Sequence, residues 1–170
     1  MAKEELYQKI RRGYYIFADI EKNEQVLFLM ANNIYAPSYI SLETAFSFYN
    51  FIPEGVYAIT SITSHKTLKI ENENQNFLYK HLNPNLFFGY ELREYKNYKY
   101  RIAEPEKAIL DYFYLNPKIK GVEDFEGLRL NVFEMQSLLD KKKLEKYLVM
   151  FGNKSFSKRV HNFLSYLEYA

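Results

Sequence analysis

Two glutamates flank a proline in the stretch IAEPEKAILDYFYL, residues 102–115. Two carboxylates this close could serve as general acid and base, or could join a lysine in a magnesium-dependent nuclease. That chemistry needs neighbours that push the two pKa values apart, and the sequence shows none. Proline suits the first position of a helix, where the dipole also favours carboxylates. We therefore interpret Glu104 and Glu106 as the start of a helix and keep a nuclease as the alternative.

The predicted helix continues with an apolar stripe of Ala108, Ile109, Tyr112 and Phe113. Lys107 and Asp111 are spaced i,i+4, so we expect them on the outer face as a weak ion pair.

Other catalytic patterns are missing from the sequence. His65, His81 and His161 lie far apart and lack the spacing of metal ligands. There is no cysteine, no phosphate-binding glycine loop and no nucleophile elbow. We therefore predict a protein that is not an enzyme and that holds no metal or cofactor.

The composition bounds the class of protein. Of the 170 residues, 48% are apolar and 18% aromatic, which favours one folded domain over a disordered chain. The net charge of +2 gives no overall field toward nucleic acid. The apolar run at 26–31 is too short to span a bilayer, and the charged N-terminal residues lack the core of a signal peptide. We expect a cytoplasmic protein without a membrane partner.

The pattern along the chain predicts an α+β fold. Residues 5–18 read as two short strands around a basic turn, and residues 22–33 as a helix. Ser41 is expected to cap a second helix that ends near Asn50. Residues 55–103 hold five β-like runs, which predict an antiparallel sheet of four or five strands. Further helices are predicted from Pro105 to before Pro117 and over 131–140, 142–151 and 155–168.

Basic residues form several candidate binding surfaces. Lys9, Arg11 and Arg12 border the N-terminal hairpin and could contact phosphates, although a solvated turn explains them equally well. Lys158 and Arg159 lie on an amphipathic helix whose basic side is a candidate nucleic-acid surface. A basic patch for a partner is predicted at Lys66, Lys99 and Arg101. In the strand YKYRI, alternation separates Lys99 and Arg101 from two tyrosines, which equally fits a sheet with one solvated face.

Four stretches, in the same order, resemble one family. IAEPEKAILDYFYL resembles the A-x-P-E-K-A-L-L-D signature of the AbiEi-type antitoxins of type IV toxin–antitoxin systems. SYISLETAFSFYNFIPEGVYAITSIT (38–63), SHKTLKIENENQNFLYKHLNPNLFFGY (64–90) and IRRGYYIF (10–17) resemble further segments of that family. The resemblance spans about residues 9–115.

The resemblance implies a function and a domain plan. It implies an antitoxin for abortive infection and phage defence, which counteracts a nucleotidyltransferase-like toxin without requiring a direct complex. Such proteins are similar in having an N-terminal winged helix that represses their own operon. Here only ten residues precede Arg11, which leaves no room for a recognition helix. We expect residues 1–20 to be a wing-like β-hairpin, the remnant of that domain, and residues 21–170 to be the antitoxin domain. The alternative is a transcriptional regulator or a nonspecific DNA- or RNA-binding protein.

Overall fold

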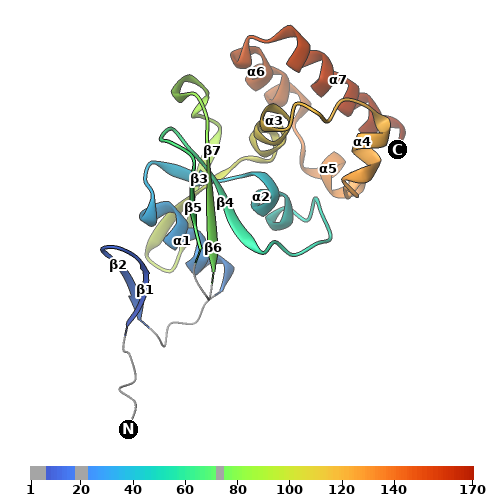
Figure 1. Ribbon diagram of the computed structural model, residues 1–170. Coiled ribbons are helices and arrows are strands. Elements are labelled where there is room, and N and C mark those ends of the chain that lie inside the picture. The colour runs from blue at the N-terminus through green and yellow to red at the C-terminus, as the bar shows by residue number, and fades with distance from the viewer. Residues whose placement is uncertain (1–6, 18–22, 72–74) are drawn as a thin grey trace.

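The computed structural model describes residues 7–17, 23–71 and 75–170 (Figure 1). Within these ranges the fold is α+β, with a six-stranded mixed sheet, a separate two-stranded hairpin and seven α-helices. The strands are β1 (Tyr7–Arg11), β2 (Tyr14–Phe17), β3 (Ser38–Ile40), β4 (Ala58–Thr63), β5 (Leu68–Ile70), β6 (Asn76–His81), β7 (Tyr90–Tyr95) and β8 (Tyr98–Ala103). The helices are α1 (Glu24–Ile34), α2 (Leu42–Phe48), α3 (Pro105–Leu115), α4 (Val122–Gly127), α5 (Val132–Leu138), α6 (Lys141–Phe151) and α7 (Lys154–Tyr169).

The six strands lie in the order β5-β6-β4-β3-β8-β7. The pairs β3–β4, β5–β6 and β7–β8 are antiparallel, whereas β4–β6 and β3–β8 are parallel. The α+β class is therefore confirmed, but the predicted antiparallel sheet of four or five strands is wrong in strand number and direction. The additional strand is β3, whose three residues are too few to show a period-two pattern. Its parallel neighbour β8 follows some 60 residues later, and no local pattern encodes such a pairing.

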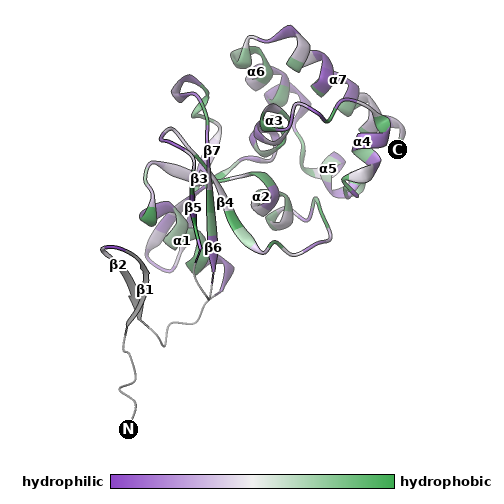
Figure 2. Ribbon diagram, in the orientation of Figure 1, coloured by the Kyte–Doolittle hydropathy of each residue, from purple (hydrophilic) through white to green (hydrophobic). Residues whose placement is uncertain are grey.

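The helices cover both faces of the sheet (Figure 1). On one face, α1 packs through Phe28, whose ring lies 5.5 Å from that of Tyr100, and through the carbonyl of Ala31, which accepts a 2.8 Å hydrogen bond from Tyr79. On the other face, Thr44 of α2 is hydrogen-bonded to Thr60 of β4, and α3 is bonded to Tyr39 of β3. The sheet is thus covered on both sides around β3 and β4, which explains why every residue of β4 after Ala58 is buried, although three of them are Thr or Ser (Figure 2).

The C-terminal helices form a second apolar cluster against α3. The rings of Phe113, Phe125 and Phe163 lie 4.7 to 5.9 Å apart and join α3, α4 and α7. The predicted helices at 22–33, 131–140, 142–151 and 155–168 are confirmed as α1, α5, α6 and α7. Helix α4 was not predicted, because its six residues hold one buried apolar side chain, Phe125, too few for a helical periodicity.

Arg159 of α7 is held in this cluster by backbone carbonyls at the end of α3. Its guanidinium donates to the carbonyl oxygens of Phe113 at 3.1 Å, Asn116 at 3.3 Å and Ile119 at 3.0 Å. The last carbonyls of a helix have no partner within the helix, so the bond to Phe113 satisfies a group that α3 leaves open, and the other two bonds hold the chain that follows α3. Arg159 therefore connects α7 to α3, whereas its neighbour Lys158 is exposed.

We predict that Arg159→Ala lowers the free energy of unfolding by about 2 kcal/mol, because charge-assisted hydrogen bonds to half-buried carbonyls are lost. Lys158→Ala should change it by less than about 0.5 kcal/mol, as expected for an exposed side chain. Urea unfolding followed by circular dichroism measures both. Equal losses in the two variants would contradict the structural role of Arg159.

Candidate functional site

A buried ion pair lies at the junction of the sheet and α3. Lys107 and Asp111 are both fully buried, and the ammonium of Lys107 donates to Oδ1 of Asp111. The prediction that this pair lies on the outer face is therefore wrong. Two hydroxyls donate to Oδ2 of the same carboxylate, that of Tyr39 at 2.8 Å and that of Ser41 at 2.9 Å. The carboxylate thus receives donors from α3, β3 and the residue that precedes α2.

Aromatic rings enclose the ammonium of Lys107. Its Nζ lies 5.1 Å from the ring centre of Phe88, 5.4 Å from that of Phe151 and 5.5 Å from that of Tyr39. The backbone of Gly89 packs closely against Lys107, because a Cβ at this position would lie only 3.0 Å from Cγ of Lys107. Its φ of +70° also favours glycine. The Nζ of Lys107 also donates a 3.0 Å hydrogen bond to the hydroxyl of Tyr39. The cation is therefore stabilised by one carboxylate, one hydroxyl and the faces of rings, in place of water.

Burial opposes both charges of the pair. It raises the pKa of Asp111, although the Lys107 ammonium and the two hydroxyl donors act in the opposite direction. Burial likewise lowers the pKa of Lys107, against the attraction of Asp111. Because neither side chain reaches the surface, a substrate cannot contact the pair in this conformation. The arrangement can hold three chain segments together, and it offers no accessible acid or base.

The turn from β3 into α2 directs Ser41 toward Asp111. Ser41 occupies the predicted N-cap position, but its hydroxyl makes no capping bond and donates to Asp111. The backbone N–H of Thr44, which Ser41 would cap, donates to Oγ1 of Thr60 at 3.1 Å instead. The next residue, Leu42, has a φ of +57°, a conformation that bulky residues rarely adopt. Backbone strain of this kind costs about 1–3 kcal/mol, which the surrounding contacts must offset.

Glu104 and Glu106 begin α3 as predicted, at the N-cap position and just after Pro105. Their side chains, however, do not cap α3 but bind α6. Oε1 of Glu106 accepts a 2.8 Å bond from the backbone N–H of Asp140, the residue before α6, and Glu104 accepts a bond from the hydroxyl of Tyr147. Lys143 lies 3.4 Å from Glu104 and 3.7 Å from Glu106. The two carboxylates therefore join α6 to the start of α3.

This carboxylate cluster also shifts the pKa values of its partners. Burial and the bond to Glu104 raise the pKa of Tyr147. Burial lowers the pKa of Lys143, but the charges of Glu106 and Glu104 outweigh that effect and raise it.

In the part of the chain that the structure describes, no group of three His, Asp or Glu side chains could hold a metal ion.

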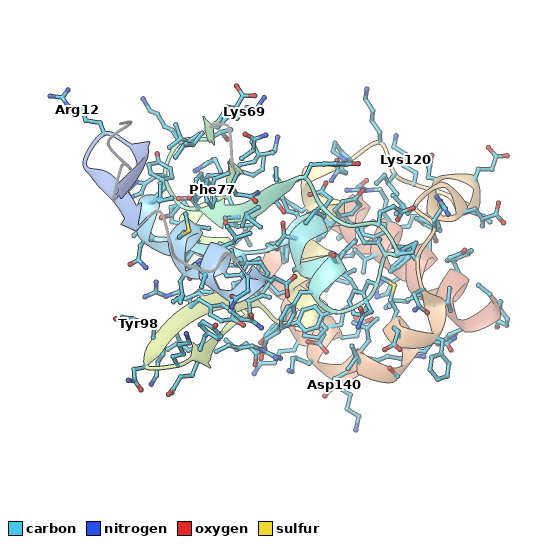
Figure 3. The ribbon with its side chains drawn as sticks, turned by 90° about the horizontal axis from the view of Figure 1, so that it is seen from below. Arg12, Lys69, Phe77, Tyr98, Lys120 and Asp140 are labelled. Atoms are coloured by element: carbon cyan, nitrogen blue, oxygen red, sulfur yellow. The ribbon has the colours of Figure 1, made fainter. Side chains whose placement is uncertain are left out.

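The predicted basic residues lie on separate elements. Lys9 and Arg11 belong to β1, and their side chains lie outside what the structure describes, whereas Arg12 is exposed at the turn of the hairpin (Figure 3). Lys66 is exposed between β4 and β5, and Lys99 is exposed on β8. These residues stay predicted contacts for nucleic acid or a partner.

The exposed and buried faces predicted for β8 agree with the structure for only some of its side chains. Arg101 is half-buried, so less of it is available to a partner than of Lys99. The two tyrosines differ: Tyr100 is buried, but Tyr98 remains 68% exposed beside the hairpin turn (Figure 3). Tyr98 was thus not predicted as a surface residue.

A groove between α6 and α7 is lined by basic side chains of α7, the helix for which the sequence predicts a basic side. The groove has a volume of about 570 Å³ and is lined by Lys154, Lys158 and His161 of α7. Val149 of α6 adds an apolar side chain that is 78% exposed. The ring of His161 is paired with Glu145 at 2.9 Å, so the two lysines supply the positive charge. The helical spacing of 154, 158 and 161 was the signal in the sequence.

Comparison with known proteins gave no assignment: no protein-family model matches the chain, and no curated protein matches it significantly. Among the described residues, no helix combines the length and the hydrophobicity needed to cross a membrane.

We predict that Asp111→Asn lowers the free energy of unfolding by about 3–5 kcal/mol, because it leaves the Lys107 charge buried without a counter-ion. Lys107→Met, which strands the carboxylate, should also be strongly destabilising. The double variant Lys107→Met/Asp111→Asn should lose clearly less than the two single losses added together. Urea unfolding of the three variants provides the cycle, and strictly additive losses would show that the two charges do not depend on each other.

Proposed function

We propose that the protein is an AbiEi-like antitoxin that counteracts a nucleotidyltransferase-like toxin. The observation that supports this most is where the family-like segments meet. Tyr39 and Ser41 come from the segment SYISLE, Phe88 and Gly89 from LFFGY, and the ion pair from EPEKAILD. Three stretches of resemblance that are far apart in sequence therefore supply one buried cluster.

This convergence bears on the quality of the resemblance. The letters shared with the family include three residues that make these contacts, Glu106, Lys107 and Asp111, and Gly89, where any side chain would clash with Lys107. A chance similarity would not be expected to select residues that touch one another in space. The convergence supports a shared fold, and the antitoxin activity is inferred from the resemblance.

The proposed mode of action is through surface charge and not through turnover of a substrate. The charged residues nearest to the signature, Glu104, Glu106, Lys107 and Asp111, are occupied by contacts within the chain. The exposed groove of Lys154, Lys158 and Val149 remains as a surface for a partner. A direct, stable complex with the toxin is not part of the proposal.

We predict that co-expression of this chain relieves the growth arrest caused by its cognate nucleotidyltransferase-like toxin. Lys154→Glu/Lys158→Glu should reduce the relief, because it reverses the charge of the groove. Lys118→Glu/Lys120→Glu changes the net charge equally on exposed residues elsewhere and should leave the relief intact. Colony counts under toxin induction measure it. Arrest that persists with the unaltered, well-expressed chain would overturn the antitoxin proposal.

The second candidate is a nucleic-acid-binding protein, favoured by the two lysines beside an exposed apolar side chain in the same groove. If it holds, duplex DNA of any sequence should bind with an affinity that falls steeply with salt. Lys154→Glu/Lys158→Glu should then lower the slope of log K against log salt by about two. Gel shifts with the chain's own promoter and with an unrelated duplex measure this. Undetectable binding at low salt would exclude the candidate.

A further inference from the structure

Strand β7 is the last strand of the sheet and is bordered on one side only by β8. Residues 92–94 at its middle are exposed, and the side chain of Leu92 is 60% exposed. In Figure 3 the β7–β8 hairpin, which carries Tyr98, runs along the border of the molecule. An exposed edge strand presents unpaired backbone N–H and C=O groups to any second strand.

The register shows which backbone groups point outward. A two-residue turn joins Tyr95 to its pair Tyr98, and hydrogen-bonded pairs alternate from there along the hairpin. The carbonyl of Gly89 accepts from the N–H of Glu104 at 2.9 Å, as this alternation requires. Odd-numbered residues of β7 therefore bond to β8. The backbone groups of Tyr90, Leu92 and Glu94 point away from the sheet, and among the described residues no strand pairs with them.

We propose that β7 pairs with β7 of a second copy of this chain, antiparallel and about a two-fold axis at Leu92. Leu92 then faces Leu92 of the second copy, and the two exposed apolar side chains cover each other. On the opposite face of the sheet, Glu91 is paired with Arg93 of the second copy. On the same face as Leu92, Tyr90 is paired with Glu94 of the second copy. The outward backbone groups of both strands are satisfied, and the two six-stranded sheets become continuous. This interface goes beyond the proposed antitoxin role and does not depend on it.

The charges on β7 select this register over its neighbours. An axis at Arg93 would place Arg93 against itself, and an axis at Glu91 would place Glu91 against itself. Like charges directly opposite each other destabilise a strand pair, whereas opposite charges stabilise it. Glu91 and Arg93 already pair within one chain at 2.7 Å, so their side chains reach the same side of the strand.

Charged residues often protect an edge strand from association. Protection by repulsion requires the charges that meet to have the same sign. Along Glu91–Leu92–Arg93 the signs are opposite on either side of a central apolar residue, so the strand is complementary to itself about Leu92. This symmetry favours a second copy over an unrelated strand as the partner.

Cross-linking tests the register directly, because the chain has no cysteine of its own. In a hydrogen-bonded antiparallel pair the two Cα atoms are about 5.5 Å apart, a distance that a disulfide can bridge. Leu92→Cys should therefore form a covalent dimer under mild oxidation. In Glu94→Cys the two cysteines would be about 13 Å apart along the strand, and cross-linking should be at least tenfold slower. Equal rates for both variants, or no cross-link in either, would overturn the proposal.

Sedimentation velocity of the full chain from 1 to 200 µM tests the dimer without oxidation. A dimer that strengthens with concentration is expected, and a monomer throughout this range would refute it. Arg93→Glu should raise the dissociation constant at least tenfold, and Glu91→Arg/Arg93→Glu should restore it. Lys158→Glu makes the same change in net charge on α7 and should have no effect. A dimer insensitive to Arg93→Glu would place the interface elsewhere and equally refute the proposal, with the folded state of each variant checked by circular dichroism.

Discussion

A charge that is taken out of water must be met by another, and this constraint organises the centre of the protein. The Lys107 ammonium and the Asp111 carboxylate are fully buried, so each requires the other and the hydroxyls around them. Those hydroxyls come from β3 and from the turn into α2, and the enclosing rings include Phe88 before β7. A buried ion pair adds little net stability over apolar packing, but leaving one partner alone is costly. The pair therefore favours the one arrangement in which all three segments meet.

The same constraint fixes how the helical part joins the sheet. Glu104 and Glu106 stand beside the ion pair in sequence and bind Tyr147 and the start of α6. At the C-terminal end of α3, Arg159 of α7 donates to backbone carbonyls. Helix α3 is thus held at both ends by the C-terminal helices and at its middle by β3. Residues that looked available for chemistry in the sequence are occupied in holding this helix.

The sequence predicts the longer elements because they depend on local periodicity, as in α1, α6 and α7. It does not predict β3 or the parallel pairs, since Ile40 beside Ile102 is a contact between distant segments. The i,i+4 spacing of Lys107 and Asp111 is the same on a surface and in a core. One signal in the sequence could have shown that this pair is buried and not on the surface: residues 108–115 hold Asp111 as their only charge. A helix that is apolar on all sides is a buried helix. For Lys158 and Arg159, no signal in the sequence shows which one is exposed.

The two candidate binding surfaces, the groove between α6 and α7 and the edge strand β7, present different chemical groups. The groove between α6 and α7 presents two lysines of α7 beside Val149 of α6, which suits an extended or anionic partner. The edge of β7 presents backbone groups and a self-complementary charge pair, which suits another strand. Because the groove lies between α6 and α7 and the edge belongs to the sheet, substitutions in one leave the contacts of the other intact. The proposed partner binding and the proposed self-association can therefore be tested separately, and a loss of function caused by one can be distinguished from a loss caused by the other.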